Sequence, residues 1–76
     1  MDEFKTRDLA ESSALIIKGK ILERMEREGR VCIFVFKDRK KCEEISNQYF
    51  FGELEVNARE FYETIIRLKN RIFAKN

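Results

Sequence analysis

Six consecutive apolar side chains, Val31 to Phe36, form the longest apolar run in the chain. Its β-branched and aromatic residues favour a strand, and the run has the length of a strand. Successive side chains of a strand point to opposite faces, so a strand with one face in water alternates apolar and polar residues. This run does not alternate. Both faces of the predicted strand therefore need a cover.

The apolar run is the second arm of a predicted β-hairpin in residues 20–37, which turns near Gly29. Glycine can adopt the positive φ that a tight hairpin turn requires. A two-residue loop would pair Arg27 with Arg30, whereas a three-residue loop with a bulge would pair Glu26 with Arg30. The second is favoured because it places opposite charges across the strands.

The side chains of the hairpin divide between two faces in either register, because side-chain direction alternates. In the first arm, one face carries Leu22, Arg24 and Glu26, and the other carries Ile21, Glu23 and Met25. In the second arm, one face carries Val31, Ile33 and Val35, and the other carries Cys32, Phe34 and Phe36. Helices of the chain can cover one face well. The outer face, with Leu22, Val31, Ile33 and Val35, is covered either by a helix of the same chain or by a second copy of the hairpin.

Three predicted helices carry clear end signals. The N-cap of the first is Asp8, in a capping box with Glu11, or alternatively Thr6. The other N-caps are Asp38 and Asn57, and Gly19 and Gly52 end the first two helices.

The helical periodicity also predicts the surroundings of two side chains. Leu15 falls opposite the apolar face of the first helix, between Glu11 and Lys18, and is expected to be exposed. In the last helix, Glu63 is expected to pair with Arg67 at i, i+4.

The predicted order is helix, β-hairpin, helix, short strand at residues 53–56 and long C-terminal helix. This is an α+β fold with helices packed on a small antiparallel sheet. A chain of 76 residues, 43% of them hydrophobic and 39% charged, fits a single compact domain, residues 1–76. Domains this small often need a further source of stability, and oligomerisation is one that remains open here.

The residue types that usually carry catalysis or bind metals are scarce. The chain has no His, and Cys32 and Cys42 form neither a CxxC pair nor part of a second cluster, so both are expected to be free thiols. Neighbouring carboxylates such as Glu43 and Glu44 diverge by about 100° on a helix and do not converge on one atom. We therefore expect no enzyme, no cofactor, no metal and no small-molecule substrate.

The location of the protein is predicted from what the chain lacks. No charged-then-apolar leader opens it, and no apolar run approaches the ~18 residues of a membrane span. The sequence thus predicts a cytoplasmic protein without membrane contact.

The preferred hypothesis is a non-catalytic binding or adaptor domain that forms a homodimer through the outer face of the hairpin. The contact would consist of Leu22, Val31, Ile33 and Val35, with Leu15 as a contributor. A different protein partner, as for a small inhibitor, fits the size equally well.

Two basic clusters support an alternative, a nucleic-acid-binding accessory protein. One cluster is Lys37, Arg39, Lys40 and Lys41, and the other is Arg67, Lys69, Arg71 and Lys75, within residues 67–75. Lys40 and Lys41 oppose the helix dipole in a first turn, so helix preference does not explain them. If the start of the second helix lies beside the end of the last one, the clusters merge into one phosphate-binding surface.

Three stretches, "FKTRDLAESSALIIKG", "EREGRVCIFVFKD" and "QYFFGELEVNAREFYETIIRLKNRIF", carry a recognisable pattern. It comprises a Thr-x-Asp-Leu start, a first helix ended by Gly, an aromatic strand ending in Phe-x-Asp, and a Tyr-x-x-Gly turn. In these features the chain resembles a family of uncharacterised small domains of bacteria, archaea and phages. The matching positions are Phe4, Thr6, Asp8, Leu9, Gly19, Phe34, Phe36, Tyr49, Gly52, Val56, Leu68 and Lys69. The resemblance implies the domain limits and no activity, and this chain departs from it at residues 12–14, Ser-Ser-Ala.

Overall fold

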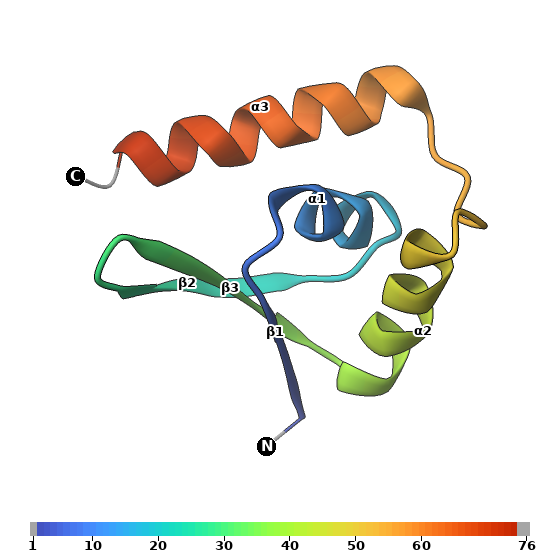
Figure 1. Cartoon of the computed structure of the whole chain (residues 1–76), viewed down its shortest axis with the longest axis horizontal. Helices are drawn as coiled ribbons and strands as arrows, with labels where there is room; N and C mark the ends of the chain where they lie inside the picture. Colours follow the sequence, from blue (N-terminus) through green and yellow to red (C-terminus); the bar gives the residue numbers. More distant parts are fainter. Residues whose placement is uncertain (1, 75–76) are drawn as a thin grey trace.

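The computed structural model describes residues 2–74 as three helices and a three-stranded antiparallel sheet (Figure 1). The elements in chain order are β1 (Glu3–Thr6), α1 (Leu9–Ile17), β2 (Leu22–Glu28), β3 (Val31–Lys37), α2 (Arg39–Phe50) and α3 (Ala58–Ala74). The predicted α+β class and the order helix, hairpin, helix, helix are confirmed.

The third strand is β1 and not residues 53–56, which form no strand, so that prediction was wrong. β1 pairs antiparallel with β3, with Phe4 opposite Phe36, and the sheet order is β1-β3-β2. Residues 51–57 instead connect α2 to α3 at a distance from the sheet (Figure 1). The apolar strand β3 is therefore the central strand, with its backbone paired on both sides.

The hairpin turns through a two-residue loop, Gly29 and Arg30, and Glu28 pairs with Val31. Gly29 has φ +60, and a two-residue loop with glycine first is a type II′ arrangement, which matches the twist of the flanking strands. Both predicted registers were wrong. In the observed register Gly29 takes the first position of the loop, where a type II′ turn requires a positive φ.

A β-bulge between Leu22 and Arg24 changes which side chains of β2 face the helices. Leu22 lies opposite Phe36 and packs against the core, whereas Arg24 lies opposite Val35 on the other side of the sheet. The prediction that Leu22 belongs to the outer face was wrong, because the extra residue of a bulge interrupts the strict alternation of a strand.

The core lies between the sheet and the helices, and its buried members are Leu15, Phe34, Phe36, Cys42 and Leu68. Leu15 is 0% exposed, so its predicted exposure was wrong. The reason is that α1 lies between the sheet and α3 (Figure 1), so that apolar side chains on two sides of this helix are covered.

Small buried residues allow α1 to be packed on several sides. Ser12, Ser13 and Ala14 are each 0% exposed, and α1 contacts both α2 and α3. The hydroxyl of Ser13 donates to the carbonyl of Leu9 at 2.9 Å, which satisfies it within the helix. The Ser-Ser-Ala departure thus lies where neighbouring helices approach closely.

Candidate functional site

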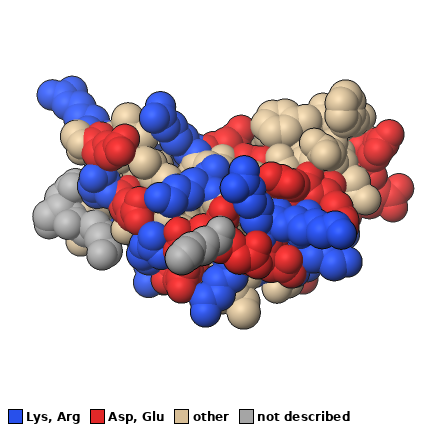
Figure 2. Space-filling view, turned by 90° about the horizontal axis from the view of Figure 1, so that it is seen from below, with Lys and Arg blue, Asp and Glu red and all other residues tan. Residues whose placement is uncertain are grey.

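The outer face of the sheet is covered by charged side chains of the same chain. The guanidinium of Arg24 lies 2.8 Å from a carboxylate oxygen of Glu3, 3.2 Å from Glu23 and 2.8 Å from Glu26. Two lysines join this set, since Lys5 lies 3.6 Å from Glu26 and Lys37 lies 3.7 Å from Glu23. We call these six residues the ionic layer. Seen from below the sheet, acidic and basic side chains are interspersed (Figure 2).

The ionic layer shields the apolar residue beneath it. Val35 pairs with Lys5 and Arg24 on its two sides and is 0% exposed, because the aliphatic stems of long charged side chains cover apolar surface while their heads stay in water. The hydrogen bond from Arg24 also lowers the pKa of Glu3 below its ordinary value of 4.5. The chain itself therefore covers the second face of the apolar strand at its centre.

The residues predicted to form a dimer contact do not form one surface. Leu15 and Leu22 belong to the core, and Val35 lies beneath the ionic layer. Ile33 is half-buried, and Val31 is 37% exposed near the turn. Of the five predicted contact residues, only Val31 and Ile33 therefore remain accessible on this face.

The basic cluster at the start of α2 is largely neutralised by its own neighbours. Arg39 pairs with Glu43 at 3.0 Å and Lys41 with Glu44 at 3.9 Å, while Lys37 belongs to the ionic layer. Lys40 is exposed. The cluster therefore presents little net positive charge as a unit.

The second basic cluster lies elsewhere. Arg67, Lys69 and Arg71 belong to the C-terminal half of α3, which ends at the left in Figure 1, whereas α2 begins at the bottom. Lys75 lies outside the described residues. The two clusters do not lie side by side, so they do not merge into one surface.

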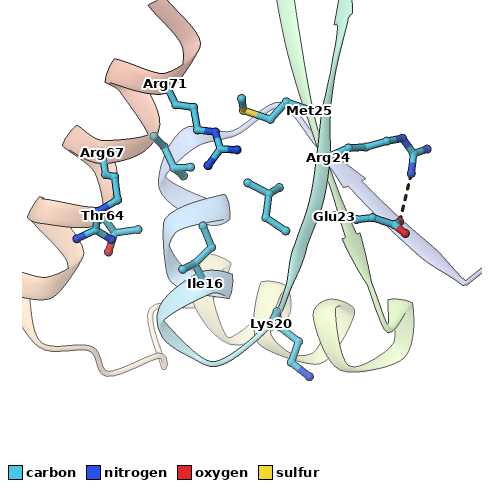
Figure 3. A pocket seen from close by; sticks show the side chains of 10 residues that line it. Ile16, Lys20, Glu23, Arg24, Met25, Thr64, Arg67 and Arg71 are labelled. Carbon is cyan, nitrogen blue, oxygen red and sulfur yellow. Dashed lines mark hydrogen bonds and ion pairs between the residues drawn. The ribbon is translucent and has the colours of Figure 1, made fainter. Parts of the chain in front are cut away.

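Two arginines of this second cluster line a cavity of about 450 Å³ between β2, α1 and α3, which we call the β2–α3 groove. Its apolar lining consists of Ile16, Leu22, Met25 and Leu68. Arg67 and Arg71 line it from α3 (Figure 3). Glu23 and Arg24 also line the cavity, but their side chains extend to the other side of β2, where they pair with each other (Figure 3).

The guanidinium groups of the groove lack acidic partners. Within residues 2–74, neither Arg67 nor Arg71 forms an ion pair, whereas Lys20 at the groove's end binds Asp38 at 3.4 Å. The predicted Glu63–Arg67 pair is not formed, because Glu63 binds Arg59 at 3.1 Å instead. The groove thus combines an apolar floor with two uncompensated positive charges.

One wall of the groove is an edge strand. β2 is hydrogen-bonded to β3 on one side only, since the sheet order is β1-β3-β2. Residues beside a two-residue loop form a hydrogen-bonded pair, and such pairs alternate with non-hydrogen-bonded ones along an antiparallel ladder. Counting from Glu28, the backbone groups of Arg27 and Met25 point away from β3. They are available to another strand.

A buried carboxylate, which the sequence suggested only as part of a capping box, lies between the helices and β1. Glu11 is 4% exposed, and it accepts hydrogen bonds from the hydroxyl of Thr6 at 2.5 Å and from the hydroxyl of Ser46. It thereby connects β1, α1 and α2. With both oxygens bonded to hydroxyls of the fold, its evident role is structural.

The described residues also include two free thiols. Cys32 is half-buried, and Cys42 is buried and donates to the carbonyl of Lys37 at 3.3 Å. Burial raises the pKa of the Cys42 thiol, which keeps it protonated and makes it a weak nucleophile. Residues 2–74 contain no group of three or more Cys, Asp or Glu side chains placed to hold a metal ion.

Neither the length nor the apolar character of any helix within residues 2–74 suffices for a membrane span.

No curated protein and no solved structure matches the chain. A family described as "Domain of unknown function (DUF5659)" matches residues 1–74, nearly the whole sequence. The chain therefore belongs to this family of domains of unknown function.

Proposed function

We propose that this domain is a non-catalytic binding module that holds an extended, acidic segment of a protein partner in the β2–α3 groove. The supporting observation is that Arg67 and Arg71 line an apolar groove without acidic partners of their own within residues 2–74. Two unpaired guanidinium groups beside apolar side chains favour a ligand that carries both carboxylates and apolar groups.

The free edge of β2 specifies how such a segment would bind. An extended peptide adds to an exposed sheet edge through main-chain hydrogen bonds, and pockets for alternate side chains supply the specificity. The backbone groups of Met25 and Arg27 would pair with the segment. Its inward side chains would then contact Leu22 and Leu68, and its carboxylates would bind Arg67 and Arg71.

A protein segment suits this surface better than a nucleic acid does. Affinity for nucleic acid grows with the number of phosphates that Lys and Arg neutralise, and each contact requires an available cation. Three of the four cations at the start of α2 are already paired with glutamates of the chain. The two arginines of the groove offer only a short anionic footprint.

The test is binding of a terminally blocked, fluorescently labelled peptide with the repeat Val-Thr-Glu-Thr, whose Val and Glu side chains share one face when the peptide is extended, measured by fluorescence anisotropy. We expect the wild-type domain to bind it and the double variant Arg67→Gln, Arg71→Gln to lose roughly 10-fold or more in affinity, since a charge-assisted hydrogen bond is worth about 1.5–3 kcal/mol. A matched double variant, Lys40→Gln with Lys69→Gln, removes the same charge at two exposed residues that do not line the groove and should bind like the wild type.

Two controls identify the class of ligand. The same peptide with Lys in place of Glu should not bind. A single-stranded oligonucleotide at ~50 mM salt should not be retained either, because retention at low salt marks phosphate binding. If the oligonucleotide is retained and the double variant Lys40→Glu, Lys41→Glu abolishes this retention, the nucleic-acid function replaces this proposal. If the two glutamine double variants bind the peptide equally well, the groove is refuted as the binding site.

A further inference from the structure

We propose that the free edge of β2 also pairs with the same edge of a second copy of this chain, antiparallel, with Met25 on the two-fold axis. The inference goes beyond the proposed function and does not depend on it. It moves self-association from the outer face of the sheet, which the ionic layer covers, to the edge of the sheet.

The backbone of β2 is arranged for this pairing. Glu28 and Val31 flank the two-residue loop, so their pair is hydrogen-bonded and the pair of Met25 with Phe34 is not. The N–H and C=O of Met25 therefore point to the free edge. Two copies related by a two-fold axis at this residue would exchange both hydrogen bonds, as the hydrogen-bonded pairs of an antiparallel ladder do.

The sequence of β2, "LERMERE", is complementary to itself in this register. Counting outward from Met25, Arg24 of one copy lies opposite Glu26 of the other, and the reverse pair forms on the other side of the axis. Both residues face the ionic layer, where Arg24 already binds Glu26 of its own chain at 2.8 Å. The next positions add no pair, because Glu23 belongs to the ionic layer whereas Arg27 lies on the other face of the sheet and donates to the carbonyl of Ile72. Opposite charges directly across two strands stabilise their pairing.

The neighbouring registers are disfavoured by the same side chains. Residues paired across two antiparallel strands point to the same face of the sheet. The two-fold axis can therefore lie at a residue but not between two residues. With the axis at Glu26, this carboxylate faces its own copy, and with the axis at Arg24, two guanidinium groups face each other. Like charges directly opposite are destabilising. The charge pattern therefore specifies one register, the one centred on Met25.

This pairing would join the two three-stranded sheets into one continuous sheet. It uses the strand edge that the proposed peptide segment would also use, so dimer and peptide complex exclude each other. The unpaired arginines Arg67 and Arg71 play no part in the charge pairing, which allows the two proposals to fail separately.

The decisive experiment is a mixing test by sedimentation equilibrium at ~100 μM, well above a micromolar dissociation constant. The wild type should approach twice its 9.2 kDa mass. Arg24→Glu and Glu26→Arg should each sediment as a monomer, because each variant chain meets like charges across the two-fold axis. An equimolar mixture of the two variants should regain the dimer mass, because the charges are then opposite at both positions.

The mixing step separates pairing from folding, since an effect within one chain is not repaired by adding another chain. Circular dichroism must show that both variants are folded, and the double variant Arg24→Glu, Glu26→Arg, which restores the pairing in a single chain, should again dimerise. Glu44→Arg serves as the matched control on α2 and should remain dimeric. A monomeric wild type at this concentration, dimeric single variants, or a mixture that stays monomeric would each overturn the inference.

Discussion

Replacing Leu15 by Ala tests the most consequential difference between sequence and structure. The helical pattern predicts an exposed residue, and exposed substitutions usually change stability by less than about 0.5 kcal/mol. In the structure, Leu15 is 0% exposed and packs with Phe34, Phe36 and Leu68. Truncating a fully buried leucine to alanine costs about 2.7–5.0 kcal/mol, since both transfer energy and a cavity contribute. We expect a loss of at least about 3 kcal/mol.

This loss is large for so small a domain. At roughly 0.05–0.15 kcal/mol per residue, a 76-residue chain has a stability of about 4–11 kcal/mol. A domain of this size loses roughly 4–8 °C in Tm for each kcal/mol, so Leu15→Ala should lower Tm by about 12–24 °C.

Thermal and urea unfolding followed by circular dichroism measure the effect. Protein concentration must be the same for all variants, because self-association adds to apparent stability by mass action. Ile21→Ala is the matched control, since Ile21 is 66% exposed and loses a side chain of the same size. A Leu15→Ala variant that matches Ile21→Ala within ~0.5 kcal/mol would refute the burial of Leu15 between the sheet and α3.

Three further predictions concern polar contacts. Because Arg24 lowers the pKa of Glu3, this pair should stabilise the fold fully at pH values above the ordinary pKa of 4.5 and progressively less as pH falls below it. Glu3→Gln should flatten that part of a profile of stability against pH, and an unchanged profile would contradict the contact. Glu11→Gln should cost about 1–3 kcal/mol in urea unfolding, and a double-mutant cycle with Ser46→Ala should show coupling rather than additivity. Asp38 caps α2 with a positive φ of 70, a backbone conformation that glycine adopts without strain. Asp38→Ala should therefore cost about 1–3 kcal/mol of stability and Asp38→Gly less. A larger loss for Asp38→Gly than for Asp38→Ala would exclude backbone strain at this position.

Local signals of the sequence predicted the helix starts well. Asp8 accepts a hydrogen bond from the backbone N–H of Glu11 at 2.9 Å, and Asn57 accepts one from Glu60 at 3.0 Å. A cap needs only residues within one turn of the chain, so a short stretch contains all the information that decides it. The hairpin as an element is equally local, since its two arms are joined by a tight turn.

Features that depend on distant residues could not be predicted in this way. β1 becomes a strand because β3 offers it a partner, and Leu15 is buried because α3 crosses α1. The bulge at Leu22 is tied to packing as well, since it brings this side chain to the core while Arg24 reaches Glu3 on the opposite face. Local propensity gives way to tertiary contacts in each case.

The groove shows a subtler limit of sequence reasoning. Glu63 has an arginine four residues before it and another four residues after it, and both spacings permit an ion pair. The structure forms the pair with Arg59 and leaves Arg67 at the groove. Composition revealed the basic residues of α3, but only the fold shows which of them have no acidic partner within residues 2–74.

The position of β1 at the sheet margin has a consequence for proteolysis. A cut after Thr6 would remove the strand that pairs with β3, together with Glu3 and Lys5 of the ionic layer. The segment Val31–Phe36 would then become an uncharged, β-prone border with unpaired backbone groups, the kind of segment that nucleates fibrils. A trimmed chain should therefore precipitate or bind thioflavin T, while the intact chain remains clear.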